Sequence, residues 1–382
     1  GSWTVVDMAR VLIFSGFPWN PLGSDLELPG SIGNALIQPA SILGVDGLTL
    51  ALVLASLALF RGRVAVLSVL VCSVLWLGGG YWRLTTVTPL PISNPRAVLV
   101  QGNVSENEII NRQQSVENFR RYLRLTAQGT QKARLMGDDR PVVVIWPESG
   151  FPGLLDEDEL ARQVIAHAAG GASAMIGSDR EENGHWYNSL ELVDQDGKIT
   201  SIYDKSRLVP FGEYQPWIIP FNVLPGVLTP GPGLKTWDLP DIGRVGPMVC
   251  YEIIFSGSVV ARHDRPDWLV TISNDAWFGN SAGPRQHLAT GRLRAVEEGL
   301  PVVFANNTGI SAIYDAVGRE TVRLGWGRAD VIVSDIPSPL SPTIFSRYGR
   351  AIPLSLSILC VLLSFWPTVR RKRERVVMRQ KG

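Results

Sequence analysis

VVVIWPES, residues 142–149, joins a short apolar run to a polar ending, and this pattern recurs through the middle of the chain. Helix candidates at residues 112–134, 157–169 and 284–298 separate some of these runs. Short apolar runs that alternate with helices are typical of a layered α/β domain. The runs are AVLVQGN (97–103), VVVIWPES (142–149), SAMIGSD (173–179), VGPMVCYE (245–252), WLVTISND (268–275) and PVVFANN (301–307). The sequence therefore predicts one large α/β domain between Pro-rich linkers at residues 88–95 and 336–342.

Apolar residues concentrate at the two ends of the chain and predict membrane spans. Residues 64–82 carry no charge, and their length is close to the roughly 20 residues that a bilayer requires. Residues 351–367 form a second candidate span, with Trp366 as an interfacial anchor. Residues 48–60 are long enough to span a membrane only together with residues 40–47, which include Asp46. Buried helices of a soluble core are the alternative to these spans.

The charge pattern predicts how the chain is oriented in the membrane and argues against nucleic acid as a partner. The 382 residues carry a net charge of +1, so no global field favours nucleic acid. Arg61, Arg63 and the basic tail from Arg370 predict cytoplasmic segments, which places residues 83–350 on the opposite face, the periplasm of a bacterium. The expected divisions are transmembrane segments in 1–87, a periplasmic domain in 88–342, a linker and C-terminal transmembrane helix in 343–369, and a basic cytoplasmic tail in 370–382. Residues 1–23 are expected to be the tail of an apolar hairpin rather than a signal peptide, because they have no basic start and no small-residue cleavage site.

Cys250 is the only cysteine of the predicted outer domain, because Cys72 and Cys360 lie in predicted spans. A buried apolar thiol is the usual fate of a lone cysteine. The polar pair Tyr251-Glu252 favours instead a strand-to-helix elbow that exposes the sulfur.

The rest of the sequence narrows the chemistry that Cys250 could perform. No zinc, P-loop or G-x-S-x-G pattern occurs, so we expect no metal or nucleotide cofactor and no serine nucleophile. The four histidines, His167, His185, His263 and His287, are expected to face solvent or to satisfy local hydrogen bonds.

A carboxylate can replace histidine as the base when burial raises its pKa. Glu148 follows an apolar strand and is such a candidate. An ammonium from Lys205, in a loop with Pro210 and Gly212, would stabilise a thiolate or an oxyanion. Spacing alone leaves open the alternative that this glutamate and lysine are ordinary surface residues.

Three motifs resemble the signatures of the nitrilase superfamily, in the form found in its apolipoprotein N-acyltransferase branch. They are WPES (146–149), YDKSRLVPFGEY (203–214) and VCYEIIF (249–255). SNDAWFG (273–279), GPRQHLATGRLRAVE (283–297), NNTGISA (306–312), VQGN (100–103) and GFPWNPLG (16–23) extend the likeness over nearly the whole chain. The resemblance implies a four-layer α-β-β-α sandwich inserted between the last two membrane helices.

The resemblance also implies roles for individual residues. Glu148 is expected to be the general base, Lys205 the stabilising cation and Cys250 the nucleophile. Glu213 matches a second glutamate that supports the triad, and Tyr251 and Glu252 match residues that shape the site. Apolar residues in 217–228 are expected either to form an arm that dips into the membrane interface or to pack as an ordinary loop. The candidates for contact with substrate in that segment are Trp217, Phe221 and Leu224.

The implied reaction takes an acyl chain from a membrane phospholipid, through a cysteine thioester, to the N-terminal amine of diacylglyceryl-cysteine in an apolipoprotein. It needs no cofactor. The alternatives are a membrane-tethered nitrilase or amidase acting on a small C–N substrate, a conjugal-transfer homologue of the nitrilase type, and a non-catalytic membrane scaffold. Two departures from the family pattern are expected to matter. The N-terminal membrane portion is shorter than the family's, as in a truncated chain, and residues 106–111 (ENEIIN) lack a tryptophan that the family often carries there.

Overall fold

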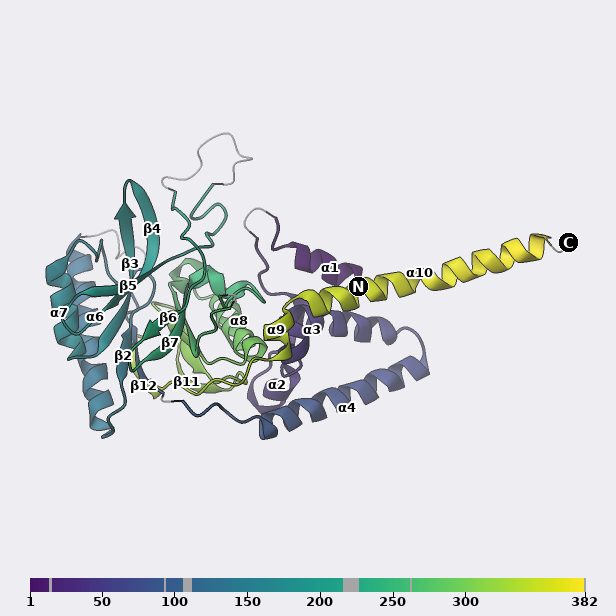
Figure 1. Cartoon of the computed structure of the whole chain (residues 1–382), viewed down its shortest axis with the longest axis horizontal. Coiled ribbons are helices and arrows are strands. Elements are labelled where there is room, and N and C mark those ends of the chain that lie inside the picture. Colours follow the sequence, from purple (N-terminus) through teal and green to yellow (C-terminus); the bar gives the residue numbers. More distant parts are fainter. Residues whose placement is uncertain (14–15, 93, 106–111, 216–226, 262, 381–382) are drawn as a thin grey trace.

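Two β-sheets lie face to face in the computed structural model, which describes residues 1–13, 16–92, 94–105, 112–215, 227–261 and 263–380 (Figure 1). The first sheet has the strand order β12-β1-β2-β3-β4-β5. Its middle strands β1, β2 and β3 are parallel, and the flanking strands are antiparallel. The strands are β1 (Arg96–Gln101), β2 (Val142–Ile145), β3 (Ser173–Glu182), β4 (His185–Val193), β5 (Ile199–Asp204) and β12 (Asp330–Asp335).

The second sheet has the order β11-β10-β9-β8-β7-β6 and the same mixed character. Strands β7, β8 and β9 run parallel at its centre. The strands are β6 (Trp237–Leu239), β7 (Gly243–Val249), β8 (Trp268–Ser273), β9 (Val302–Asn306), β10 (Ser311–Tyr314) and β11 (Glu320–Leu324).

The main core lies between the sheets, where Leu99 and Ile145 of the first sheet meet Val249 and Val270 of the second. Outer helices bury the other face of each sheet, so the central parallel strands are apolar on both sides. The six apolar runs of the sequence accordingly correspond to β1, β2, β3, β7, β8 and β9, and their prediction as strands is confirmed.

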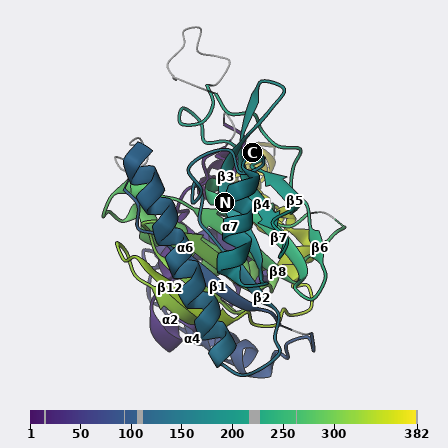
Figure 2. The same ribbon diagram turned by 90° about the vertical axis from the view of Figure 1, so that its left-hand side faces the viewer.

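Helices complete the predicted four-layer α-β-β-α order. Figure 2 shows α6 (Arg112–Leu135) and α7 (Glu159–Ala169) in front of the first sheet. Helix α8 (Gly283–Glu298) and the short 3-10 helix η2 (Cys250–Ile254) cover the second sheet. The Asp158 side chain caps α7 by accepting the Ala161 N–H at 2.9 Å.

The ends of the sandwich domain come together in the first sheet. Strand β12 closes this sheet by pairing antiparallel with β1, with Arg96 opposite Asp335 and Gln101 opposite Asp330. An ion pair of 2.7 Å between Arg96 Nε and Asp335 Oδ1 joins the two strands. The chain therefore enters β1 and leaves β12 on the same side of the sandwich, toward the apolar helices.

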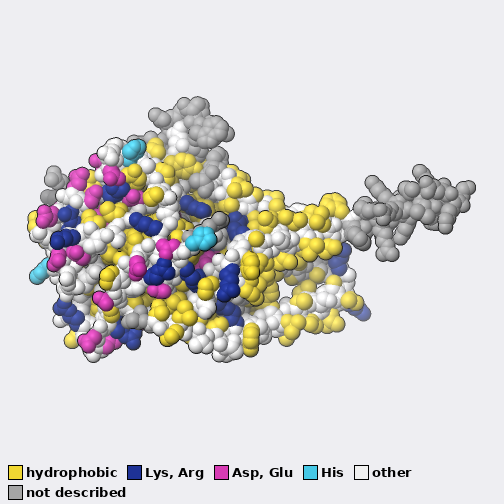
Figure 3. Space-filling model, in the orientation of Figure 1, with side chains coloured by type: hydrophobic (Ala, Val, Ile, Leu, Met, Phe, Trp, Pro, Cys, Tyr) yellow, Lys and Arg dark blue, Asp and Glu magenta, His cyan; other side chains and the backbone are white. Residues whose placement is uncertain are grey.

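Apolar helices extend from one side of the sandwich (Figure 1). By length and composition, α3 (Ala40–Ala58) and α4 (Arg63–Thr86) can each cross a membrane, and the apolar part of α10 at 351–365 is shorter. Figure 3 shows hydrophobic side chains gathered over this end, while charged side chains spread over the sandwich. The other helices among the described residues are α1 (Ser2–Ala9), η1 (Leu22–Leu26), α2 (Gly30–Leu36), η3 (Asp275–Phe278), α9 (Ile344–Tyr348) and α10 (Ala351–Gln380).

Helix α3 includes residues 40–47, as the predicted span required, and a kink at Gly44 fits it against the sandwich. Gly44 has φ +62°, a left-handed conformation that glycine adopts without strain. Next to the kink, the Val45 N–H donates to Glu297 Oε1 of α8 at 2.7 Å. Asp46 pairs with Arg350 Nε at 2.7 Å, so this acidic residue of a predicted span has a cationic partner.

Candidate active site

Cys250 occupies the elbow between β7 and η2. Its φ of +52° is unusual for a residue other than glycine and costs on the order of 1–3 kcal/mol, so the surrounding contacts must hold it. The predicted strand-to-helix elbow is therefore present, and Cys250 is partly exposed. Burial and the nearby Glu148 carboxylate raise the pKa of the thiol well above its ordinary value, against the opposing effect of Lys205. A thiol whose pKa is raised in this way needs a base to take its proton.

Glu148 lies just beyond β2 and is 6% exposed. Its Oε1 accepts a hydrogen bond from Asn188 Nδ2 at 2.6 Å, and its Oε2 accepts the Asn274 N–H at 2.8 Å. Asn188 belongs to the first sheet and Asn274 follows β8 of the second, so both sheets orient this carboxylate.

Lys205 is almost completely buried and lies between two carboxylates. Its Nζ donates to Glu213 Oε1 at 2.5 Å and lies 3.5 Å from Glu148 Oε1. Burial disfavours the ammonium, but the two carboxylates outweigh it and raise the pKa of Lys205 above its ordinary value. Glu213 is fixed in turn by the Val209 N–H, which donates to its Oε2 at 2.8 Å. Lys205 is thus a fixed positive charge beside Glu148.

Glu252 connects the lysine loop to the elbow rather than contacting the sulfur. It accepts hydrogen bonds from the backbone N–H groups of Ser206 at 2.8 Å and Val249 at 2.9 Å. The Tyr203 hydroxyl also donates to it at 2.8 Å. A single buried carboxylate therefore ties the strand before Cys250 to the residues that flank Lys205.

Tyr251 contacts the N-terminal segment. Its hydroxyl donates to the Gly16 carbonyl, and its ring stacks on Phe17 with centroids 5.9 Å apart. The adjacent Trp19 donates from Nε1 to Gln286 Oε1 of α8 at 2.8 Å. The segment 16–23, which precedes the apolar helices, thus packs directly on the elbow.

A second polar network lies on the other side of Cys250. Ser273 Oγ is 3.4 Å from Cys250 Sγ and donates to Asp275 Oδ1 at 2.8 Å. Asp275 Oδ1 also lies 2.8 Å from His287 Nδ1, and His287 Nε2 lies 3.1 Å from the Cys250 carbonyl oxygen. Asn306 Nδ2 donates to Asp275 Oδ2 at 2.6 Å. This network reaches both the sulfur and the backbone of Cys250.

Comparison with known proteins assigns the chain to a family. The profile of the Carbon-nitrogen hydrolase family matches residues 117–343. An apolipoprotein N-acyltransferase of Rhodopseudomonas palustris is 33% identical over 392 residues, which cover 95% of this chain and 72% of the relative. That of Bradyrhizobium diazoefficiens is 33% identical over 402 residues, covering 97% and 72%. The chain belongs to the apolipoprotein N-acyltransferase family. Among solved structures, an amidase from Nesterenkonia sp. is 18% identical with a TM-score of 0.48, covering 72% of this chain and 99% of the amidase.

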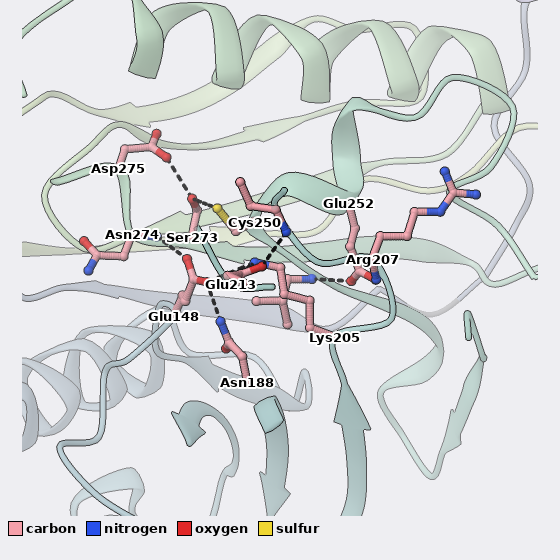
Figure 4. A network of polar contacts seen from close by, with 12 residues as sticks. Glu148, Asn188, Lys205, Arg207, Glu213, Cys250, Glu252, Ser273, Asn274 and Asp275 are labelled. Atoms are coloured by element: carbon pink, nitrogen blue, oxygen red, sulfur yellow. Dashed lines mark hydrogen bonds and ion pairs between the residues drawn. The ribbon is translucent and has the colours of Figure 1, made fainter. Parts of the chain in front are cut away.

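Figure 4 shows how the candidate residues of this N-acyltransferase family member lie. Glu148, Lys205, Glu213 and Cys250 converge, whereas Glu252 supports the site from beside the lysine loop. The expected substrate contacts Trp217, Phe221 and Leu224 lie outside the described residues, as does the segment 106–111. Beside the lysine loop, an apolar cavity of about 350 Å³ is lined by Arg10, Ile13, Phe17, Pro210 and Phe211.

Of the two alternatives expected for the histidines, solvent exposure is wrong for His287 in this N-acyltransferase homologue, whereas hydrogen bonding is observed. His287 does not face solvent; it is fully buried and contacts the backbone of Cys250. Helix α8 is buried on nearly all sides, so no apolar stripe in the sequence distinguishes an inward residue. Ligand atoms of Cys250, Asp275 and His287 lie within 4.8 Å of one another, a spacing that a metal ion accepts. Both ring nitrogens of His287 already face protein oxygens, so a metal ion would have to displace one of these contacts.

Proposed function

We propose that the chain is an N-acyltransferase of lipoprotein maturation. It moves a fatty acyl chain from a membrane phospholipid, through a thioester on Cys250, to the N-terminal amine of diacylglyceryl-cysteine in an apolipoprotein. The observation that carries this proposal is the convergence of Glu148, Lys205 and Cys250 in a member of this family. Apolar helices beside the site support lipid substrates, because both substrates stay in the bilayer.

The first half-reaction forms the thioester. Glu148 takes the proton of the Cys250 thiol as the sulfur attacks the ester carbonyl of the phospholipid. The tetrahedral oxyanion forms near the Lys205 ammonium, which is charged before the reaction and so needs no reorganisation. When the intermediate collapses, the ester C–O bond breaks and the leaving alkoxide takes the proton from Glu148. A lysophospholipid departs and the acyl chain stays on Cys250.

The second half-reaction consumes the thioester. The neutral amine of the acceptor attacks the thioester carbonyl, and Glu148 takes one of its protons. Collapse of the second tetrahedral intermediate breaks the C–S bond and forms the amide, and the thiolate recovers its proton from Glu148. Glu213 keeps Lys205 in place through both steps, because it binds the ammonium at 2.5 Å without contacting the sulfur.

The same proposal includes a membrane topology. Residues 1–87 hold transmembrane segments of a bacterial inner membrane, residues 88–342 form a catalytic domain in the periplasm, residues 343–369 return through the membrane, and residues 370–382 remain in the cytoplasm. Its support is the placement of α3, α4 and α10 on one side of the sandwich and the basic residues around Arg61 and Arg370. Activity of a periplasm-specific reporter fused after Gly382 would contradict this orientation.

Intact-mass analysis of protein purified from membranes tests the chemistry. The expected result is a fatty-acyl adduct that hydroxylamine removes and that Cys250→Ser lacks. Cys72→Ser and Cys360→Ser are matched controls that keep the adduct, because Cys72 lies in α4 and Cys360 in α10. Hydrolysis of small amides without any lipid-derived adduct would replace this proposal with that of a membrane-tethered amidase.

A further inference from the structure

Both ring nitrogens of His287 face oxygen atoms that can only accept hydrogen bonds, if Asp275 is ionised. His287 Nδ1 lies 2.8 Å from the Asp275 carboxylate, and Nε2 lies 3.1 Å from the Cys250 carbonyl oxygen. A neutral imidazole has one N–H and could satisfy only one of these oxygens, whereas the imidazolium ion donates to both. With an ionised Asp275, this arrangement of acceptors favours a doubly protonated ring.

The surroundings of the ring favour the cation. The Trp19 centroid lies 5.6 Å from that of His287 and the Phe304 centroid 5.1 Å, distances at which an aromatic ring can attract a cation. Burial opposes the charge, but Asp275, the hydrogen bond to Cys250 and the more distant Glu148 outweigh it and raise the pKa of His287 above its ordinary value.

Asp275 is itself fixed, so it can hold the ring in one orientation. It accepts hydrogen bonds from Ser273 Oγ at 2.8 Å and from Asn306 Nδ2 at 2.6 Å, in addition to that from His287. Ser273 has one hydroxyl proton, which can point either to Asp275 or to the Cys250 sulfur 3.4 Å away. The orientation of His287 is thus linked to the hydroxyl that contacts the sulfur.

The contact with the Cys250 carbonyl acts where the backbone is strained. Cys250 has φ +52°, and its peptide bond to Tyr251 is trans. A charge-assisted hydrogen bond to this carbonyl fixes the plane of that peptide, and with it the direction of the Tyr251 N–H, which points away from the carbonyl.

We propose that His287 is a positioning residue for Cys250. It is a doubly protonated imidazolium that clamps the Cys250 carbonyl and is held in place by Asp275 and by Trp19 of the N-terminal segment. Trp19 thereby connects the segment that precedes the apolar helices to the elbow. The proposal rests on the proposed function only in naming Cys250 as the nucleophile, and its main tests need no lipid.

Nitrogen-15 NMR of protein labelled at histidine measures the charge directly. In a pH titration we expect the signal of His287 to show both ring nitrogens protonated up to a higher pH than the ordinary value near 6.5. The signal should disappear in His287→Gln and persist in the control His167→Gln, whose histidine is exposed on α7. A His287 ring that loses a proton at or below pH 6.5 would overturn the proposal.

Two further variants test the clamp and the role of Trp19. Trp19→Leu should lower the pKa of His287, and Trp19→Phe should lower it by less. An unchanged pKa in Trp19→Leu would remove Trp19 from the proposal.

The reactivity of Cys250 tests the contact between His287 and the Cys250 carbonyl. The single substitution His287→Gln should slow alkylation of Cys250 by a small soluble thiol reagent roughly tenfold, while His167→Gln leaves it unchanged. In acyl transfer, His287→Gln should lower kcat and leave KM unchanged. Unchanged alkylation, or a change in KM alone, would contradict positioning of the nucleophile.

Discussion

Glu148→Gln exchanges one carboxylate oxygen for an NH₂ group where both oxygens accept hydrogen bonds. If the new side chain turns its NH₂ toward Asn274, two donors meet, because the backbone N–H there cannot turn away. If the NH₂ points toward Asn188, that amide can flip, but its own NH₂ is then left at the place of the unpaired Asn188 Oδ1. Either arrangement leaves a buried donor unmatched, which costs about 1–3 kcal/mol.

The exchange also removes a charge 3.5 Å from Lys205 Nζ. The attraction between unit charges at that distance is about 5 kcal/mol for an effective dielectric constant of ~20. The lost desolvation cost of the carboxylate offsets much of this, and Lys205 keeps Glu213 at 2.5 Å. We therefore expect a net destabilisation of about 2 kcal/mol, which lowers Tm by roughly 4–8 °C for a domain of this size.

Thermal unfolding and single-turnover acylation separate the structural cost from the chemical one. Glu148→Gln should slow formation of the Cys250 thioester by at least about 100-fold, because no carboxylate takes the thiol proton. Adding Asn188→Asp supplies an acceptor for the new NH₂ group and restores the negative charge, so Tm should recover. The thioester should not recover, because the carboxylate is now displaced from the base position. Wild-type acylation in either variant would refute the assignment of Glu148 as the base.

Three further predictions concern the groups around the elbow. Lys205→Arg should slow thioester formation by roughly 10²–10³-fold in single-turnover measurements. The planar guanidinium group cannot occupy the space of the smaller ammonium group between Glu148 and Glu213. Glu252→Gln should lower the free energy of unfolding by about 1–3 kcal/mol and increase hydrogen exchange at the Ser206 amide, whose acceptor it weakens. The pKa of His287 is raised on folding, so its contribution to stability is complete below about pH 6.5 and is lost as the pH rises through the folded-state pKa. In denaturant titrations the stability difference between wild type and His287→Gln should therefore shrink as the pH is raised above 6.5; a difference that grows would contradict the sign.

The sequence predicts the central strands well and the outer strands poorly, for one physical reason. Strands β1, β2, β3, β7, β8 and β9 are buried on both faces and therefore appear as continuous apolar runs. Strands such as β5 and β11 lie at sheet edges with mixed burial, so polar residues interrupt them. Each pairs with the strand just before it in the chain, β4 or β10, but its exposed polar residues hide the strand pattern.

The site shows the same division between local and long-range information. Glu148 and Cys250 each follow a buried strand, so a polar residue at the end of an apolar run marks both of them. Lys205 lies in a loop, and only motif resemblance separates it from a surface lysine. His287 meets Cys250 because α8 packs against η2, a tertiary contact that residue spacing does not encode.

The pairing of β1 with β12 has a consequence for biosynthesis. At ~5–20 residues per second, the ribosome needs roughly 10–50 s to make the chain between Gln101 and Asp330, about 230 residues. Throughout that interval β1 has an open hydrogen-bonding edge, and the four central residues of its RAVLVQ sequence are apolar. Such an edge invites pairing with other extended chains. Nascent chains halted before Asp330 should consequently depend on chaperones far more than chains halted after Asp335, and ribosome-stalled fragments of the two lengths would differ in aggregation even though each contains Glu148, Lys205 and Cys250.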